Sequence, residues 1–157
     1  MIVCFTGHRE LGSVEEKKRL YARLLLQVEE SIKNGATVFR TGGALGFDTA
    51  AALAVLETKK KHPSIRLELL LPCPNQTSGW SARQIEVYET IRDSADFVTY
   101  LSKEYFPGVM HKRNRALVDG ADACIACWNG GARGGTAYTV NYALKKGIPV
   151  INLAQGE

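Results

Sequence analysis

The segment "DACIACWNGGARGGTAYTVNYALKKGIPVINLA", residues 122–154, holds one complete strand–helix–strand pattern. An apolar run is followed by a turn with four glycines, then by a stretch with helical spacing of its apolar residues, and then by a second apolar run. Two strands joined through a helix run parallel, because parallel strands need a long crossover connection. The segment therefore predicts a βαβ unit of a parallel sheet.

The same alternation extends over the whole chain. The predicted strands are 2–6, 37–41, 65–72, 96–102, 122–128 and 149–154, and the predicted helices are 14–35, 47–61, 81–95, 109–121 and 135–147. Strands that are apolar almost throughout are typical of a parallel sheet covered on both faces. We therefore expect an α/β fold in one domain, residues 1–157: a Rossmann-like, doubly wound, mostly parallel sheet of about six strands with helices on both faces.

Composition narrows the class of protein. The chain is 45% hydrophobic and 23% charged, and its net charge of +4 is too small and too dispersed to indicate a nucleic-acid partner by itself. No apolar run approaches the roughly 20 residues that span a bilayer, and the first residues do not resemble a signal sequence, so we expect a cytoplasmic protein without a membrane partner. The cysteines, which show no metal-ligand spacing, are expected to be buried structural residues: Cys4, Cys73, Cys124 and Cys127.

The junctions between strands and helices carry the functional signal. In a doubly wound sheet, ligands bind beyond the carboxyl ends of the strands. Three junctions there are rich in glycine: "TGHRELGS" (6–13), "TGGALGFD" (41–48) and "NGGARGGT" (129–136). Glycines of this kind are also used simply to form tight turns. Their coincidence at one rim, together with Arg9 and Arg113, favours a ligand that bears phosphate, because helix N-termini and guanidinium groups both bind anions.

The candidate ligand-binding residues all belong to this rim. They are Gly7, His8, Arg9, Gly42, Gly43, Asp48, Arg113, Asn114, Gly130, Gly131, Gly134, Gly135 and Thr136. Two of them have equally simple structural interpretations. His8 could bond the ligand or cap a buried turn, and Asp48 could contact a ribose hydroxyl or water, or complement the dipole of its helix. Neither a metal-ligand motif nor a cofactor motif is present, so a nucleotide-type ligand is the small molecule that the motifs imply.

The motifs resemble the YpsA-like branch of the SLOG superfamily, a Rossmann-like group that also includes the LOG phosphoribohydrolases and the DNA-processing protein DprA. The resemblance rests on "FTGHR" (5–9), "GGALGFD" (42–48), "MHKRN" (110–114) and "GGARGGTAYTVNYA" (130–143), and it covers nearly the whole chain. It implies that Arg113 and the loop 130–136 hold the phosphate of a nucleotide. It also implies that the chain could form a homo-oligomer, as SLOG relatives often do.

The sequence departs from the LOG enzymes at their catalytic positions. Thr139 stands where those enzymes have a catalytic Glu, and Asn114 where they have a Lys. Cleavage of an N-glycosidic bond needs a carboxylate near an oxocarbenium-like transition state, and the candidate substitute is Asp48. We therefore expect a binding or sensor module for ADP-ribose, NAD or a nucleoside monophosphate. The first alternative is a nucleotide N-glycosidase or phosphoribohydrolase that uses Asp48, and the second is single-stranded DNA binding of the DprA type.

Overall fold

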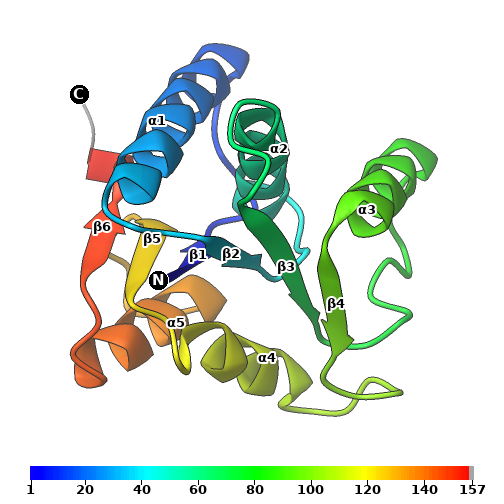
Figure 1. Ribbon diagram of the computed structural model, residues 1–157. Coiled ribbons are helices and arrows are strands. Elements are labelled where there is room, and N and C mark those ends of the chain that lie inside the picture. Colours follow the sequence, from blue (N-terminus) through cyan, green and yellow to red (C-terminus); the bar gives the residue numbers. More distant parts are fainter. Residues whose placement is uncertain (156–157) are drawn as a thin grey trace.

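Six strands form one parallel sheet in the order β4-β3-β2-β1-β5-β6 in the computed structural model, which describes residues 1–155 (Figure 1). The strands are β1 (Ile2–Gly7), β2 (Val38–Thr41), β3 (Arg66–Leu71), β4 (Phe97–Tyr100), β5 (Ala123–Cys127) and β6 (Val150–Asn152). The helices are α1 (Val14–Lys33), α2 (Phe47–Lys59), α3 (Ala82–Ser94), α4 (Val109–Val118), α5 (Gly135–Lys145) and the short 3₁₀ helix η1 (Leu153–Gln155).

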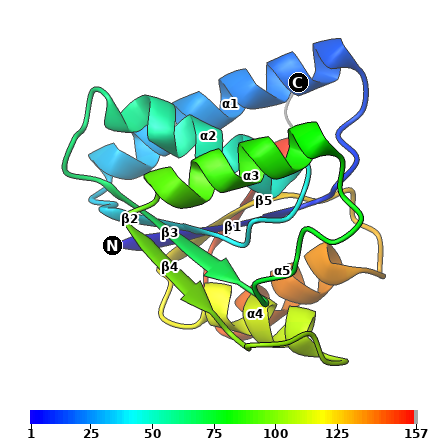
Figure 2. The same cartoon turned by 90° about the vertical axis from the view of Figure 1, so that its right-hand side faces the viewer.

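The helices cover both faces of this sheet. Helices α1, α2 and α3 lie on one face and α4 and α5 on the other, as two views at right angles show (Figures 1 and 2). The doubly wound α/β fold predicted from the sequence is thus confirmed, and every strand pair is parallel. Over residues 1–155, no helix combines the length and the hydropathy that crossing a bilayer requires.

The two helical layers bury separate parts of the core. Under α1–α3, the rings of Phe5, Phe39 and Phe47 pack together, with the Phe5 centroid 6.1 Å from that of Phe39 and 6.3 Å from that of Phe47. Under α4 and α5, a smaller cluster surrounds Cys4 and Cys124, which lie opposite each other on β1 and β5. All four cysteines are free thiols, and Cys127 alone among them is only partly buried.

Several predicted elements are longer than the observed ones. The helix predicted over 109–121 ends at Val118, because Asp119 leaves the helical conformation and Gly120 takes a positive φ of 81°. The strand predicted over 96–102 is limited to Phe97–Tyr100, and the one predicted over 149–154 turns into η1 at Leu153. These differences lie at element ends, where apolar residues continue into loops that pack against the sheet.

Helix starts fall into two groups. Helices α1 and α3 begin with a complete capping box at Ser13 and Ser81, in which the serine hydroxyl accepts from the N3 backbone N–H. Helices α2, α4 and α5 begin after Gly46, Gly108 and Gly134, and in the described chain no side chain caps any of the three. The first amides of α2 and α4 donate to the carbonyls of His8 and Phe106, whereas the first amides of α5 have no partner among the described residues. The start of α5 therefore keeps backbone donors that a ligand can use.

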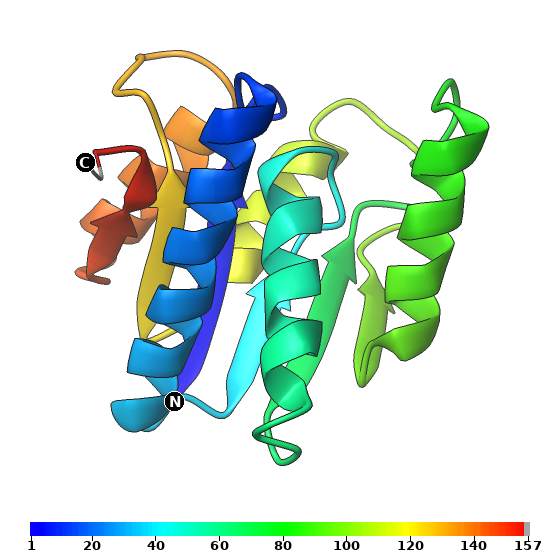
Figure 3. The ribbon, with the colours of Figure 1, turned by 90° about the horizontal axis from the view of Figure 1, so that it is seen from above.

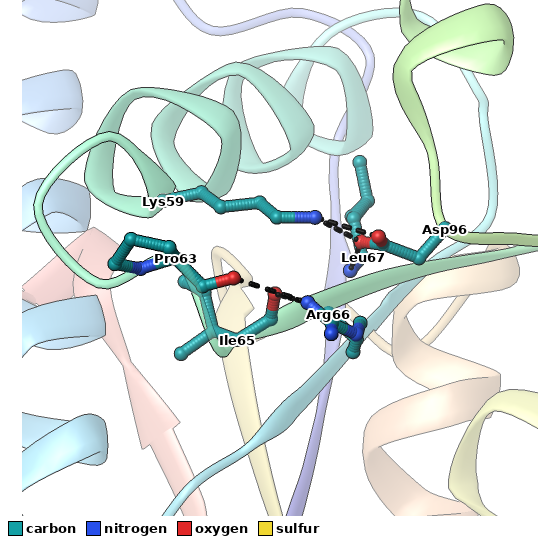
Figure 4. A network of polar contacts seen from close by, with 6 residues as sticks. All are labelled: Lys59, Pro63, Ile65, Arg66, Leu67 and Asp96. Carbon is teal, nitrogen blue, oxygen red and sulfur yellow. Dashed lines mark hydrogen bonds and ion pairs between the residues drawn. The ribbon is translucent and has the colours of Figure 1, made fainter.

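A charged network fixes the end of the sheet away from these starts (Figure 4). Lys59, in the last turn of α2, contacts the two carboxylate oxygens of Asp96 at 2.6 and 2.7 Å, and the Leu67 amide donates to Asp96 Oδ2 at 2.8 Å. Burial acts to raise the pKa of Asp96, but the bonds from Lys59 and Leu67 outweigh it, so that the pKa lies below its ordinary value of 3.8. The ionised carboxylate therefore stabilises the junction of α2, β3 and β4.

We expect Asp96→Asn to lower the free energy of unfolding at neutral pH by roughly 1.5–3 kcal/mol, the contribution of hydrogen bonds to a charged group. Because the folded pKa of Asp96 is depressed, its contribution is present above 3.8 and is lost as the pH falls through the lower folded value. The stability difference between Asp96→Asn and wild type, from urea unfolding, should therefore shrink in acid. A stability difference that is equal at neutral and at acidic pH would contradict this account. The matched control is Asp93→Asn, because the Asp93 side chain is exposed.

Candidate functional site

A cavity of about 370 Å³ lies beyond the carboxyl end of β1, the strand at which the order of the sheet reverses. Figure 3 shows the start of α1 and the loop between β5 and α5 at this same end of the molecule. The predicted residues that line the cavity are Gly7, His8, Arg9, Asp48, Arg113, Asn114, Gly135 and Thr136. Residues from β1, α2, α4 and α5, far apart in the chain, thus meet at the switch point where doubly wound sheets bind ligands.

Arg113 is the most deeply placed charge of the site. It lies on α4 with 3% of its surface exposed, its Nε donates to Asn114 Oδ1 at 2.9 Å, and its Nη1 donates to the Gly42 carbonyl. A Cβ on Gly42 would lie 2.6 Å from Nη1, so a side chain at that position would displace the guanidinium. Gly42 therefore binds the guanidinium through its carbonyl and does not line the cavity. Gly43 follows it in the same turn with a φ of 73°.

Asp48 is a buried carboxylate on the wall of the same cavity. It lies in the first turn of α2, and its Oδ2 accepts from the Ala44 amide at 3.1 Å. Burial raises the pKa of Asp48, while the positive charge of Arg113 and the backbone hydrogen bonds act against that rise. Burial likewise lowers the pKa of Arg113, against the attraction of Asp48. Buried groups with shifted pKa values that face a cavity are a frequent feature of functional sites.

His8 and Arg9 follow the end of β1 and have different surroundings. His8 Nε2 accepts from the Asn129 amide at 3.0 Å, and the His8 carbonyl accepts from Phe47 N at 3.1 Å, so His8 connects the loop after β5 to the start of α2. Arg9 is exposed, and its carbonyl oxygen lies 2.3 Å from the position that a Cβ on Gly46 would take, which is too close for a side chain there. Its side chain borders the cavity and two adjacent hollows.

The glycine-rich loop after β5 is only partly inside the site. Gly131 donates to Asn129 Oδ1 at 2.8 Å and accepts from Trp128 Nε1 at 3.0 Å, which closes a small turn. Gly130, Gly131 and Gly134 are exposed and lie outside the cavity lining, whereas Gly135 and Thr136, at the start of α5, line it. The N-cap Gly134 has a φ of 99°, a conformation that other residues rarely adopt.

Thr139 occupies a position with no access to ligand. Its side chain is fully buried, its hydroxyl donates to the Gly135 carbonyl at 2.7 Å, and it is not among the described residues that line the cavity. Asp48 is therefore the carboxylate of the cavity. Residues 1–155 bring together no cluster of His, Cys, Asp or Glu side chains suited to a metal ion.

Sequence reasoning missed Ala44, Met110 and His111, which also line the cavity. Met110 lies three residues before Arg113 on α4, and that helical spacing places both on one face, so the signal was present in the sequence. His111 stacks on Tyr138 of α5, with ring centroids 4.2 Å apart and planes at 8°. Ala44 belongs to an irregular turn and left no such periodic signal.

The chain is similar in sequence to known proteins over most of its length. A family model described as the YspA SLOG family matches residues 3–148. The uncharacterized SPbeta prophage-derived protein YoqJ of Bacillus subtilis is 35% identical over 140 residues, with 81% of each chain covered. UPF0398 protein BH1768 of Halalkalibacterium halodurans is 29% identical over 142 residues, which cover 89% of this chain and 73% of that protein.

Two solved structures share the fold at low sequence identity. DNA processing protein A from Helicobacter pylori, studied for its single-stranded DNA binding mode, has a TM-score of 0.66 at 22% identity. The match covers 96% of this chain but only 63% of that protein, less than two thirds of its length. The structural-genomics target TM1055 has a TM-score of 0.60 at 16% identity, with 95% and 71% of the two chains covered. At these identities the likeness concerns the fold.

Proposed function

The chain belongs to the YspA SLOG family, and from this premise we propose that it binds a nucleotide-derived ligand such as ADP-ribose, NAD or a nucleoside monophosphate. The ligand's phosphate and ribose occupy the cavity at the end of β1. The observation that carries the proposal is that Arg9, Arg113 and the start of α5 border one cavity at the switch point of the sheet. Cationic groups and free helix N-terminal amides are the donors that bind phosphate in proteins.

The contrast between helix starts supports this position for the phosphate. Ser13 and Ser81 cap the two helices whose starts lie outside the cavity lining, whereas α5, which begins on the cavity, has Gly134 and no capping side chain among the described residues. An anion at Gly135 and Thr136 would accept from the amides that a serine cap would otherwise satisfy. A side-chain cap there would occupy the space the phosphate needs.

Asp48 fits a ribose next to that phosphate. Its carboxylate lines the cavity, and one oxygen is fixed by the Ala44 amide, so the group is held in one orientation. A carboxylate is an acceptor for the hydroxyl groups of a sugar, as the acidic residue on the ribose is in other doubly wound folds. The ligand class is therefore a phosphorylated ribose compound instead of a simple phosphate ion.

We expect Arg9→Ala to weaken the binding of ADP-ribose about tenfold or more, because the variant loses a hydrogen bond between two charged groups. Isothermal titration calorimetry measures the dissociation constant directly. Arg9 is exposed, so its removal should leave the fold intact. Arg83→Ala is the matched control, since Arg83 is also exposed but lies on α3, paired with Glu86. An unchanged dissociation constant for Arg9→Ala would contradict a phosphate contact.

A second candidate function is hydrolysis of the nucleotide N-glycosidic bond. The specific observation in its favour is that Asp48 is a buried carboxylate with a raised pKa on the wall of the proposed ribose site. A carboxylate there could stabilise an oxocarbenium-like transition state, the role of Glu in the related enzymes. Thr139 cannot supply that charge, since its hydroxyl is bonded inside α5.

We expect the protein to bind AMP without efficient release of adenine, which chromatography of the incubated mixture detects. Loss of a single electrostatic stabiliser commonly costs about 10²–10³ in rate, and Thr139 stands here in place of the catalytic Glu of the LOG enzymes. Release that disappears in Asp48→Asn would instead favour the enzyme, because Asn keeps the acceptor for Ala44 N and removes only the charge. Rapid release by wild type would refute the binding-module proposal.

The third candidate, single-stranded DNA binding, has one supporting observation. His111, Tyr138 and Tyr142 form a run of parallel rings across α4 and α5, with Tyr142 6.5 Å from Tyr138, and Lys146 lies over Tyr142 at 5.3 Å. Aromatic rings beside cations are the usual platform for single strands. In the same calorimetric series, tight and strongly salt-dependent binding of oligo-dT that ADP-ribose does not displace would favour this candidate.

A further inference from the structure

A second hollow of about 310 Å³ opens beside the central cavity. It is bounded by the loop between β3 and α3 on one side and by the approach to α4 on the other. Arg9, Ala44 and Met110 line both spaces, so the two adjoin each other. A ligand held at the start of α5 that extends toward β3 would reach this hollow.

The walls of this hollow differ in chemistry from those of the cavity. Trp80 and Tyr105 supply aromatic surface, and Leu45 and Pro72 supply aliphatic surface. Apart from Arg9 at the shared mouth, the described residues that line it are uncharged. An aromatic, uncharged pocket favours a flat apolar ring over a phosphate or a sugar.

The two aromatic side chains are held to different degrees. The Trp80 ring packs edge-on against Tyr88, with centroids 5.5 Å apart and planes at 88°, so its orientation is fixed by the core. Tyr105 is 63% exposed, in the loop before α4. One ring is thus a rigid wall, and the other is free to close against a ligand at little cost.

A side-chain amide on the wall is fixed as well. Gln76 Nε2 donates to the Gly42 carbonyl at 3.4 Å, and Gln76 Oε1 accepts from Tyr88 OH at 3.3 Å. The same Gly42 carbonyl accepts from Arg113, so the wall of the hollow and the buried charge of the cavity share one anchor. An amide keeps a second hydrogen and a second lone pair, the pair of groups that recognises the edge of a base.

We propose that this hollow is the nucleobase subsite: a flat aromatic base stacks on Trp80 and Tyr105, with Gln76 at its edge. The inference rests on the proposed function, because the base is joined to a ribose and phosphate in the central cavity. It adds a statement about selectivity: the site prefers a ribose phosphate that carries a base to a ribose phosphate that lacks one.

The test compares ADP-ribose with ribose 5-phosphate, which has no base, by calorimetry. Tyr105→Ala should weaken ADP-ribose binding by about 5- to 100-fold, as for loss of one stacked ring, and should leave ribose 5-phosphate binding unchanged. The control is Phe97→Ala, since Phe97 is 51% exposed on β4 and lies outside the hollow. Tyr105 makes little core contact, so the variant should fold; Trp80→Leu is a second variant, with its melting temperature measured.

The outcomes separate the two proposals. If wild type binds both ligands and neither Tyr105→Ala nor Trp80→Leu weakens ADP-ribose binding, the base subsite is overturned and the proposed function stands. If both variants weaken the binding of ADP-ribose and of ribose 5-phosphate equally, the rings support the whole site and not the base alone. The base subsite is then also overturned. If wild type binds neither ligand, the proposed function fails and the subsite with it.

Discussion

The buried guanidinium of Arg113 is the interaction on which the candidate site depends. It joins α4 to the turn after β2, because its Nη1 donates to the Gly42 carbonyl. Its Nε donates to the side-chain oxygen of Asn114, the next residue on α4. A buried charge is costly unless hydrogen bonds and an opposite charge compensate it, and Gly42, Asn114 and Asp48 provide those. Residues of α4, of the turn after β2 and of α2 thus all compensate this one buried side chain.

In the described chain, close packing of the backbone around Arg113 and Arg9 accompanies free backbone donors at the start of α5. Gly42 lacks a side chain because Arg113 fills the space, and Gly46 lacks one because the Arg9 carbonyl does. The backbone thus packs closely under the cavity, while the start of α5 above it keeps donors that no described side chain caps. Serine side chains cap α1 and α3 at Ser13 and Ser81, whose positions lie outside the cavity lining. The start of α5, in contrast, lies on the cavity with amides that have no partner within residues 1–155 and that a ligand can bind.

The sequence was sufficient for the fold and for the rim of the site, because both depend on local patterns. The alternation of apolar runs with helical spacing predicted the parallel sheet, and the turns after β1, β2 and β5 identified the rim. The burial of Arg113 could not be read from the sequence, since the Gly42 carbonyl that it bonds is 71 residues away. The shape of the hollow beside Trp80 could not be read from the sequence either, because the loop before α3 has no periodicity and the Trp80 ring is positioned by packing against Tyr88.

The central claim is that a nucleotide-derived ligand binds at the end of β1, with its phosphate at the start of α5. The most direct measurement is a two-dimensional ¹H–¹⁵N NMR titration of the labelled protein with ADP-ribose. The account predicts that the largest saturable shifts occur at the amides of His8, Ala44, Gly135 and Thr136, which line the cavity. Shifts confined to the outer faces of α4 and α5, or no saturable shift at millimolar ligand, would contradict it.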